Sequence, residues 1–237
     1  MFTRFLIFIF ASLVAVQSAS AGYALRFSTS APVVGGVAQF SLGSSNSVEL
    51  YLDATDAEAG LLGTLGLSDA SLGNPGDPDI NDYSAGVTLT NTVGNAGLVS
   101  LAPNSDFDVK LSRVVGLTGA WQALSFGDSM KGTMSGSTRS ILLGTFTINA
   151  GTTIGDNGVL TIDLNAFSLA LNDPDIFDDN DGNGLIDPNT LGGSNVFQFS
   201  AVPEPGAFAL MGFAIAGGAA FLRRRKVAAR PAATEKE

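Results

Sequence analysis

Apolar and polar residues alternate with a period of two through most of this chain. Residues 47–53, for example, read Ser-Val-Glu-Leu-Tyr-Leu-Asp. Successive side chains of a β-strand point to opposite faces of a sheet, so such stretches predict strands with one buried face. Clusters of Gly, Asn, Asp and Pro, as in residues 73–78, separate them and are typical of turns. The pattern predicts strands over residues 24–28, 47–53, 85–90, 106–111, 141–148, 159–164 and 196–199.

Helical periodicity is weak between the two ends of the chain. Only residues 120–124, around the lone Trp121, indicate a helical turn. Many short strands separated by turns favour two packed sheets. We therefore predict an all-β fold, a two-sheet antiparallel β-sandwich, for residues 22–201.

The strand pattern also resembles that of a known class of sandwich. Residues 48–55 (Val-Glu-Leu-Tyr-Leu-Asp-Ala-Thr), followed by a stretch rich in Gly and Leu, and residues 141–150 are similar to the first and later strands of cohesin-like domains. The resemblance implies a cohesin-like sandwich. A jelly-roll or immunoglobulin-like sandwich is the alternative with the same alternation. The dockerin partner of cohesins is not carried over, because a shared fold does not imply a shared function.

The charge balance of the central region excludes several classes of partner. Residues 22–202 contain 19 acidic and only five basic residues. Such an acidic surface repels nucleic acid and anionic lipid, so we expect no nucleic-acid partner. The chain has no Cys, so no disulfide can stabilise an exported domain. Core packing must do so, with calcium as a candidate cofactor.

Catalysis is not expected. The sequence has no His, which removes Ser-His-Asp and Cys-His catalytic systems and His-ligated zinc sites. It also lacks a G-x-S-x-G nucleophile motif and a phosphate-binding P-loop. Paired carboxylates could hydrolyse a glycoside, but a chain this acidic contains such pairs by chance. We predict that the protein is not an enzyme.

The N-terminus has the three parts of an export signal. Arg4 provides a positive charge, residues 5–16 are an apolar stretch of 12 residues, and residues 19–21 (Ala-Ser-Ala) form a cleavage site. Twelve residues are too few to span a bilayer. We predict a signal helix within residues 1–21, recognised by the general secretion machinery and removed by signal peptidase.

The C-terminal region has the composition of a membrane anchor. Residues 206–222 are 17 residues without a charge, about 26 Å long as a helix and close to the shortest length that spans a bilayer. The four cations that follow are expected to stay in the cytoplasm, which places the body outside. We predict a single transmembrane helix in the inner membrane and a cytoplasmic tail over residues 227–237. The membrane stop consists of Arg223, Arg224, Arg225 and Lys226.

A short motif, Val202-Pro203-Glu204-Pro205, precedes this helix. Its two prolines forbid regular helix, which leaves the motif extended for a protease. Together with the apolar helix and the basic cluster, it resembles the PEP-CTERM sorting signal of exported bacterial proteins over residues 202–226. The resemblance implies recognition by exosortase, a membrane protease and transpeptidase. It also implies removal of the helix and delivery of the body to the cell surface or extracellular matrix.

One acidic loop has the spacing of calcium ligands. From position 179 the chain reads D-x-D-x-N-G-x-I-D, which is similar to the front of an EF-hand or dockerin loop. Oxygen atoms at alternate positions can converge on one hard cation, although Thr190 stands where a bidentate carboxylate would complete such a loop. The alternative is a solvated loop in which Asp and Asn are turn residues. The candidate ligands are Asp179, Asp181, Asn183, Leu185 through its carbonyl, and Asp187.

Two functions stay open at the level of sequence. The first is an exported, exosortase-sorted surface or matrix protein with a structural or adhesive β-sandwich. The second is a surface-displayed module that binds a carbohydrate or a protein, with surface polysaccharide or matrix as the candidate partner. The chain has one Trp and three Tyr, which disfavours the stacking of sugar rings.

Overall fold

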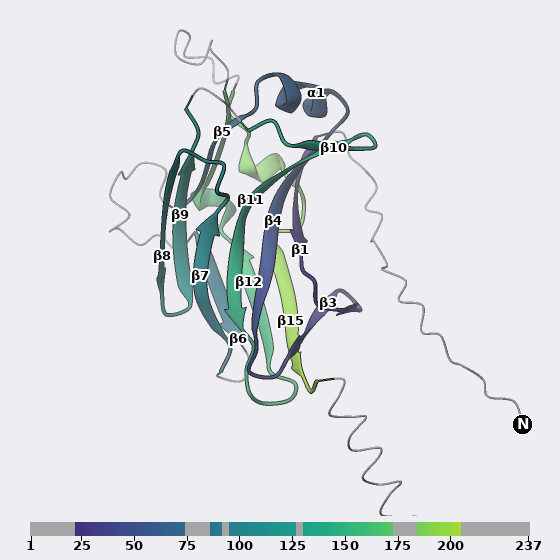
Figure 1. Cartoon of the computed structure of the whole chain (residues 1–237), viewed down its shortest axis with the longest axis vertical. Helices are drawn as coiled ribbons and strands as arrows, with labels where there is room; N and C mark the ends of the chain where they lie inside the picture. Colours follow the sequence, from purple (N-terminus) through teal and green to yellow (C-terminus); the bar gives the residue numbers. More distant parts are fainter. Residues whose placement is uncertain (1–21, 74–85, 92–94, 127–129, 173–183, 205–237) are drawn as a thin grey trace, which may run out of the picture. The chain divides into compact units, whose positions relative to one another are not determined.

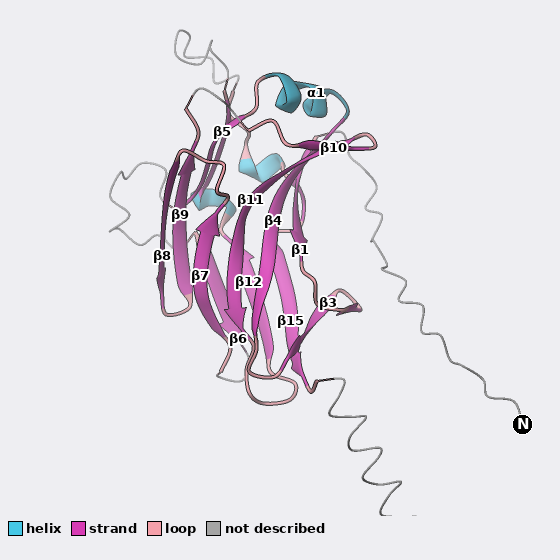
Figure 2. Cartoon of the chain, viewed as in Figure 1, coloured by secondary structure: helices cyan, strands magenta, loops and turns pink. Residues whose placement is uncertain are grey.

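The alternating segments form two facing β-sheets in the computed structural model, which describes residues 22–73, 86–91, 95–126, 130–172 and 184–204. Strands dominate this part of the chain, and helices are short (Figure 2). Along the longest strands every second side chain is buried, and these side chains fill the space between the sheets. The predicted all-β, two-sheet architecture is confirmed.

The first sheet is organised around two long antiparallel strands, β4 (Ser45–Thr55) and β11 (Thr138–Asn149), seen in front in Figure 1. They pair along their whole length. Strand β1 (Tyr23–Ser28) pairs with the other edge of β4 and makes a short parallel contact with β14, whereas β7 and β10 both pair with β11. These smaller strands are β7 (Gly97–Pro103), β10 (Thr133–Ser135) and β14 (Gly192–Gly193).

The second sheet has nine strands in the order β13-β5-β9-β6-β12-β15-β3-β2, with β8 paired to β9. The last strand in the chain, β15, therefore lies inside the sheet, between β12 and β3. The strands are β2 (Val33–Val34), β3 (Val37–Ser41), β5 (Leu67–Leu72), β6 (Val87–Asn91), β8 (Val109–Val115), β9 (Thr118–Leu124), β12 (Asn157–Ile162), β13 (Phe167–Leu171) and β15 (Val196–Val202).

A helix that the sequence pattern does not predict, α1 (Asp56–Thr64), follows β4 directly at the upper end in Figure 1. It buries only Ala59 and Leu62, so its apolar pattern is too sparse to identify. Arg139 of β11 holds it in place by donating from Nε to the carbonyl of Ala59 at 3.0 Å. Two 3-10 helices, η1 (Leu164–Ala166) and η3 (Pro188–Thr190), are the other helical elements of the described residues.

A β-bulge in β11 corrects a break in the alternation. Ile141 and Leu143 are spaced by two, as are Phe146 and Ile148, but the two pairs are out of phase by one residue. The register of β11 against β4 shifts between Leu142 and Gly144, which inserts one extra residue. All four apolar side chains consequently point into the core, because a bulge resets which residues face inward.

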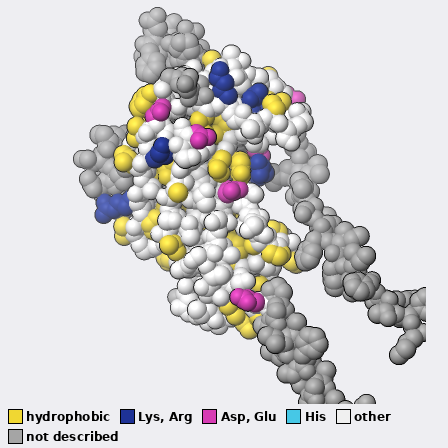
Figure 3. Space-filling model, in the orientation of Figure 1, with side chains coloured by type: hydrophobic (Ala, Val, Ile, Leu, Met, Phe, Trp, Pro, Cys, Tyr) yellow, Lys and Arg dark blue, Asp and Glu magenta, His cyan; other side chains and the backbone are white. Residues whose placement is uncertain are grey.

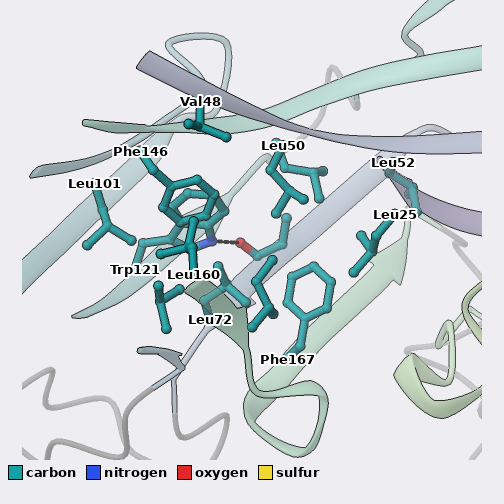
Figure 4. Packing of buried hydrophobic residues seen from close by; sticks show 14 of the residues in the cluster. Leu25, Val48, Leu50, Leu52, Leu72, Leu101, Trp121, Phe146, Leu160 and Phe167 are labelled. Carbon is teal, nitrogen blue, oxygen red and sulfur yellow. Dashed lines mark hydrogen bonds between the residues drawn. The ribbon is translucent and has the colours of Figure 1, made fainter. Parts of the chain in front are cut away.

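Aromatic rings join the two sheets inside the sandwich (Figure 4). Trp121 of β9 stacks on Phe146 of β11, with ring centroids 5.3 Å apart and an interplanar angle of 16°. The Trp121 indole also donates its Nε1–H to the carbonyl of Ala70 in β5 at 2.8 Å, which satisfies its polar group. A second stack, Phe40 on Phe199 at 5.0 Å, lies within the second sheet.

The expected strands correspond to β1, β4, β6, β8, β11, β12 and β15, with differences at their ends. The expected strand over residues 106–111 is wrong at its start, since β8 begins only at Val109. The expected helical turn at residues 120–124 is also wrong, because this segment is the C-terminal part of β9. Alternate residues Trp121 and Ala123 are buried there, and pairing with β8 and β5 stabilises the strand. The predicted signal and transmembrane helices lie outside the described residues.

The close packing of Trp121 against Gly144 at the bulge predicts that a side chain at position 144 destabilises the fold. A Cβ at Gly144 would lie 2.6 Å from Trp121 Cζ3 and 2.7 Å from the carbonyl oxygen of Ala102. Gly144→Ala should lower the free energy of unfolding by about 1–3 kcal/mol, because overpacking displaces the indole. Gly97→Ala, also in a strand but with open space at its Cβ, is the matched control and should leave the urea midpoint nearly unchanged. Equal midpoints for the two variants would contradict the prediction.

Candidate functional site

The end of β15 leads directly into the Pro-Glu-Pro motif. Ala201 is fully buried, its N–H donates to the Asp156 carbonyl at 2.8 Å, and its carbonyl accepts from the Gly155 N–H at 3.0 Å. Pro203 is half-buried and Glu204 is exposed. The chain separates into two compact units between Ala201 and Val202. The motif therefore starts where the fold ends, without a spacer.

The start of the motif lies beyond the paired part of the sheet. Strand pairing ends at Val202, and the proline that follows has no N–H with which to extend a sheet. Glu204 is exposed to solvent. Pro205 and the four cations, Arg223 to Lys226, lie outside the described residues. Among the residues that are described, no helix is long and apolar enough to cross a membrane.

The predicted calcium loop is described only at its end. Asp179, Asp181 and Asn183 lie outside the described residues. Leu185 forms an isolated β-bridge with Ala170. The two hydrogen bonds of this bridge are donated by the Leu171 N–H to the Gly184 carbonyl and by the Ile186 N–H to the Leu169 carbonyl. The Leu185 carbonyl takes no part in these two bonds.

Asp187, the last candidate calcium ligand, serves as the cap of η3. Its Oδ1 accepts from the backbone N–H and the side-chain amide of Asn189 at 2.9 and 3.0 Å. This is the turn role that the alternative interpretation assigns to the loop. Within the described ranges no group of three or more acidic side chains is placed to hold a metal. Calcium binding stays a prediction.

A row of polar side chains crosses the outer face of the first sheet. Arg26 forms an ion pair with Asp53, with Nε–Oδ2 and Nη2–Oδ1 distances of 2.5 and 3.1 Å, and Asp53 also accepts from Ser140 Oγ at 2.6 Å. The hydrogen bond to Asp53 raises the pKa of Arg26. The guanidinium lies over the Tyr51 ring, 4.4 Å from its centroid, and Tyr51 donates its hydroxyl to Glu49 at 3.0 Å. Burial and that hydrogen bond raise the pKa of Tyr51.

Besides Tyr51, the described Trp and Tyr side chains, which are of the kind that stacks on sugars, are Trp121 and Tyr23, and both point inward. Trp121 is 2% exposed, and the hydroxyl of Tyr23 is buried. Burial, and secondarily the negative charge of Glu58, raise the pKa of Tyr23. Arg26 already covers one face of Tyr51. In the part of the chain that the structure describes, these rings do not form an open platform for carbohydrate.

The outer face of the second sheet holds an acidic residue that the sequence analysis missed. Asp69 of β5 accepts from Ser71 Oγ at 2.6 Å and from Ser168 Oγ of β13 at 2.7 Å. Burial raises its pKa, and the two hydroxyls oppose this shift. Neither of these two hydrogen-bond partners is ionisable. A polar triplet of residues, Ser-Asp-x-Ser over 68–71, was the signal available in the sequence.

Comparison with protein families identifies the C-terminal segment. Residues 201–226 match the PEP-CTERM protein-sorting motif. The match begins at Ala201, the last buried residue of β15, and ends at Lys226. The resemblance that the sequence indicated over residues 202–226 is therefore confirmed. No curated protein matches the chain.

Comparison with solved structures finds cohesin domains, the class that the strand pattern resembles. CaCohA2 from Clostridium acetobutylicum has a TM-score of 0.42 and 8% identity, covering 76% of this chain and 92% of that one. The third cohesin of ScaC from Acetivibrio cellulolyticus, in complex with the ScaB dockerin, has a TM-score of 0.42 and 9% identity, covering 69% and 93%. Likeness at this level assigns neither a residue role nor a partner.

Calcium binding is tested by thermal unfolding with calcium and with chelator. If the loop binds calcium, the midpoint should rise with millimolar calcium, because an ion that binds only the folded state stabilises it. A double variant, Asp179→Asn with Asp181→Asn, should lose this rise. Asp77→Asn with Asp79→Asn, at two acidic positions outside the candidate ligand set, is the matched control and should keep it. An unchanged midpoint for the unmodified protein would exclude the site.

The environment of Asp69 predicts a pH dependence of stability. Its folded-state pKa lies above the unfolded value of 3.8, so the folded state favours the protonated carboxyl. Asp69 therefore adds to the free energy of unfolding at low pH. This stabilisation is fully present below the unfolded pKa and is lost as the pH rises through the folded pKa. Asp69→Asn should therefore remove part of the decline in the urea midpoint over this range. Asp106→Asn, at an exposed position, is the control and should follow the unmodified protein. Identical profiles for Asp69→Asn and the unmodified protein would contradict the assignment.

Proposed function

We propose that this chain is an exported protein sorted by an exosortase-type membrane protease. Signal peptidase removes residues 1–21, and residues 206–222 then anchor the chain in the cytoplasmic membrane, with the body outside. The protease acts at Val202–Pro205. The observation that carries the proposal is the match to the sorting motif at residues 201–226, which begins at the last buried residue of the sandwich.

The released body is a β-sandwich that acts at the cell surface or in the extracellular matrix, in a structural or adhesive role and without catalysis. Three observations support this part of the proposal. The chain has no His or Cys for nucleophilic catalysis, and in the described part of the chain the hydrogen-bond partners of Asp69 are two serines. The ring of Trp121 is buried in the core, and Tyr23 packs against the core.

Intact-mass measurement of the native surface product tests the sorting step. The expected mass lacks both the first 21 residues and the apolar tail. Glu204→Ala should leave the unprocessed, anchored form in the membrane, because it removes the exposed carboxylate of the motif. Asp106→Ala, which removes an exposed carboxylate on the body, is the matched control and should be processed normally. A native product that retains residues 208–222 would overturn the cleavage step.

A glycan-array screen of the processed protein separates the structural role from the alternative binding module. We expect no specific glycan to bind, because the described Trp and Tyr rings offer no open stacking platform. Saturable binding of one glycan class would favour the binding module and count against a purely structural body.

A further inference from the structure

Among the described residues, charged side chains gather at one end of the sandwich. The chain segments 27–48, 86–105, 140–162 and 188–203 contain a single charged residue, Asp156, and its side chain is buried. In Figure 3, the dark blue and magenta side chains lie mainly over the upper half, the half that carries α1 in Figure 1. The lower half of this face is white and yellow, with one acidic side chain at its tip.

The uncharged end is also the end from which the tail leaves. Gly43 donates its N–H to the Gly151 carbonyl at 3.0 Å, which joins the β3–β4 turn to the β11–β12 loop. The β11–β12 loop in turn holds Ala201 through two backbone hydrogen bonds. Ile154 at the tip of that loop is 67% exposed. We define the neutral end as residues 42–45, 95–97, 150–156 and 200–201.

The length of the connecting segment limits how far the neutral end can be from a membrane. Only residues 202–205 separate Ala201 from Gly206, where the apolar run begins. Fully extended, the path between these two Cα atoms spans at most about 18 Å. The polar headgroup layer on each side of the hydrocarbon is itself about 5–8 Å thick. A tail that has entered the bilayer therefore keeps the neutral end close to the headgroups.

Electrostatics favours this end over any other as the one next to lipid. A body with 19 acidic and five basic residues is repelled by a surface that contains anionic lipid. Because the repulsion decays over a Debye length of about 8 Å at physiological salt, the charges of the described residues at the far end add little to it. Strand β4 runs from the neutral end to α1 in 11 residues, about 35 Å.

We propose that, while the tail is anchored, the neutral end of the sandwich lies against the outer lipid surface of the membrane, with Ile154 among the headgroups. This inference rests on the proposed sorting function, because it requires the tail to be inserted. It adds an orientation of the body, with the charged end carrying α1 away from the membrane. The sorting motif is then held at the membrane surface by the fold itself.

Single fluorophores on introduced cysteines test this orientation, since the chain has no Cys of its own. The exported chain with its tail is purified from cells that lack the sorting protease. It is reconstituted in vesicles of phosphatidylethanolamine and phosphatidylglycerol whose headgroups carry nitroxide quenchers. Ile154→Cys labels the neutral end, and Leu61→Cys, also an exposed apolar residue, labels α1 as the matched control. The label at position 154 should lose fluorescence in these vesicles, and the label at position 61 should not.

The possible results separate this inference from the function on which it rests. Protein that floats with the vesicles but shows equal quenching at both positions would overturn the orientation and leave sorting intact. Protein that does not float with the vesicles would overturn both. Protection of the label at position 154 from iodide in detergent, together with a dimeric mass by light scattering, would assign this surface to a second copy and overturn the proposal.

Discussion

The stack of Trp121 on Phe146 is the contact on which the two sheets depend. A chain without Cys has no disulfide between its sheets, so dispersion and burial of apolar surface must hold them together. Trp121 contributes the largest buried side chain and anchors three strands at once, through its own strand β9, its hydrogen bond to β5 and its ring contact with β11. Gly144 makes room for the indole, because any side chain there would occupy its space. The β-bulge beside Gly144 then brings Phe146 into phase with the core.

Sequence alternation predicted the strands that have one buried and one solvated face. It did not predict segments whose conformation depends on pairing or packing with distant parts of the chain. Strands β4 and β11 alternate clearly and were expected almost to their ends. Residues 120–124 have little apolar contrast, with Ala120 and Ala123 beside Trp121, and strand β9 is extended through its pairing with β8, β5 and β6. Helix α1 was not predicted, because only two of its nine residues are buried and these do not define a helical period. Tertiary contact decided both segments, which local pattern cannot report.

The sorting segment could be identified from sequence because its information is local. A proline-containing motif, an apolar run and a cluster of cations follow one another, and each can be recognised from the sequence without knowledge of the fold. The junction with the body could not be predicted, because it depends on Ala201 being held by residues 45 positions earlier in the chain. Asp69 illustrates the same limit. Its two serine partners come from different strands, and one of them is almost 100 positions away.

The position of β15 within its sheet has a mechanical consequence. The strand that joins the tail is hydrogen-bonded on both sides, to β12 and to β3, and does not lie at an edge. Tension applied through the C-terminus acts along the strand axis, so many backbone hydrogen bonds of both neighbours are loaded in shear together. An edge strand would instead detach after losing a single row of bonds. A body pulled at this end therefore resists unfolding through a strand in the interior of its sheet. The force needed to unfold it depends on the backbone hydrogen bonds between β12 and β15 and on the core packing around Phe199.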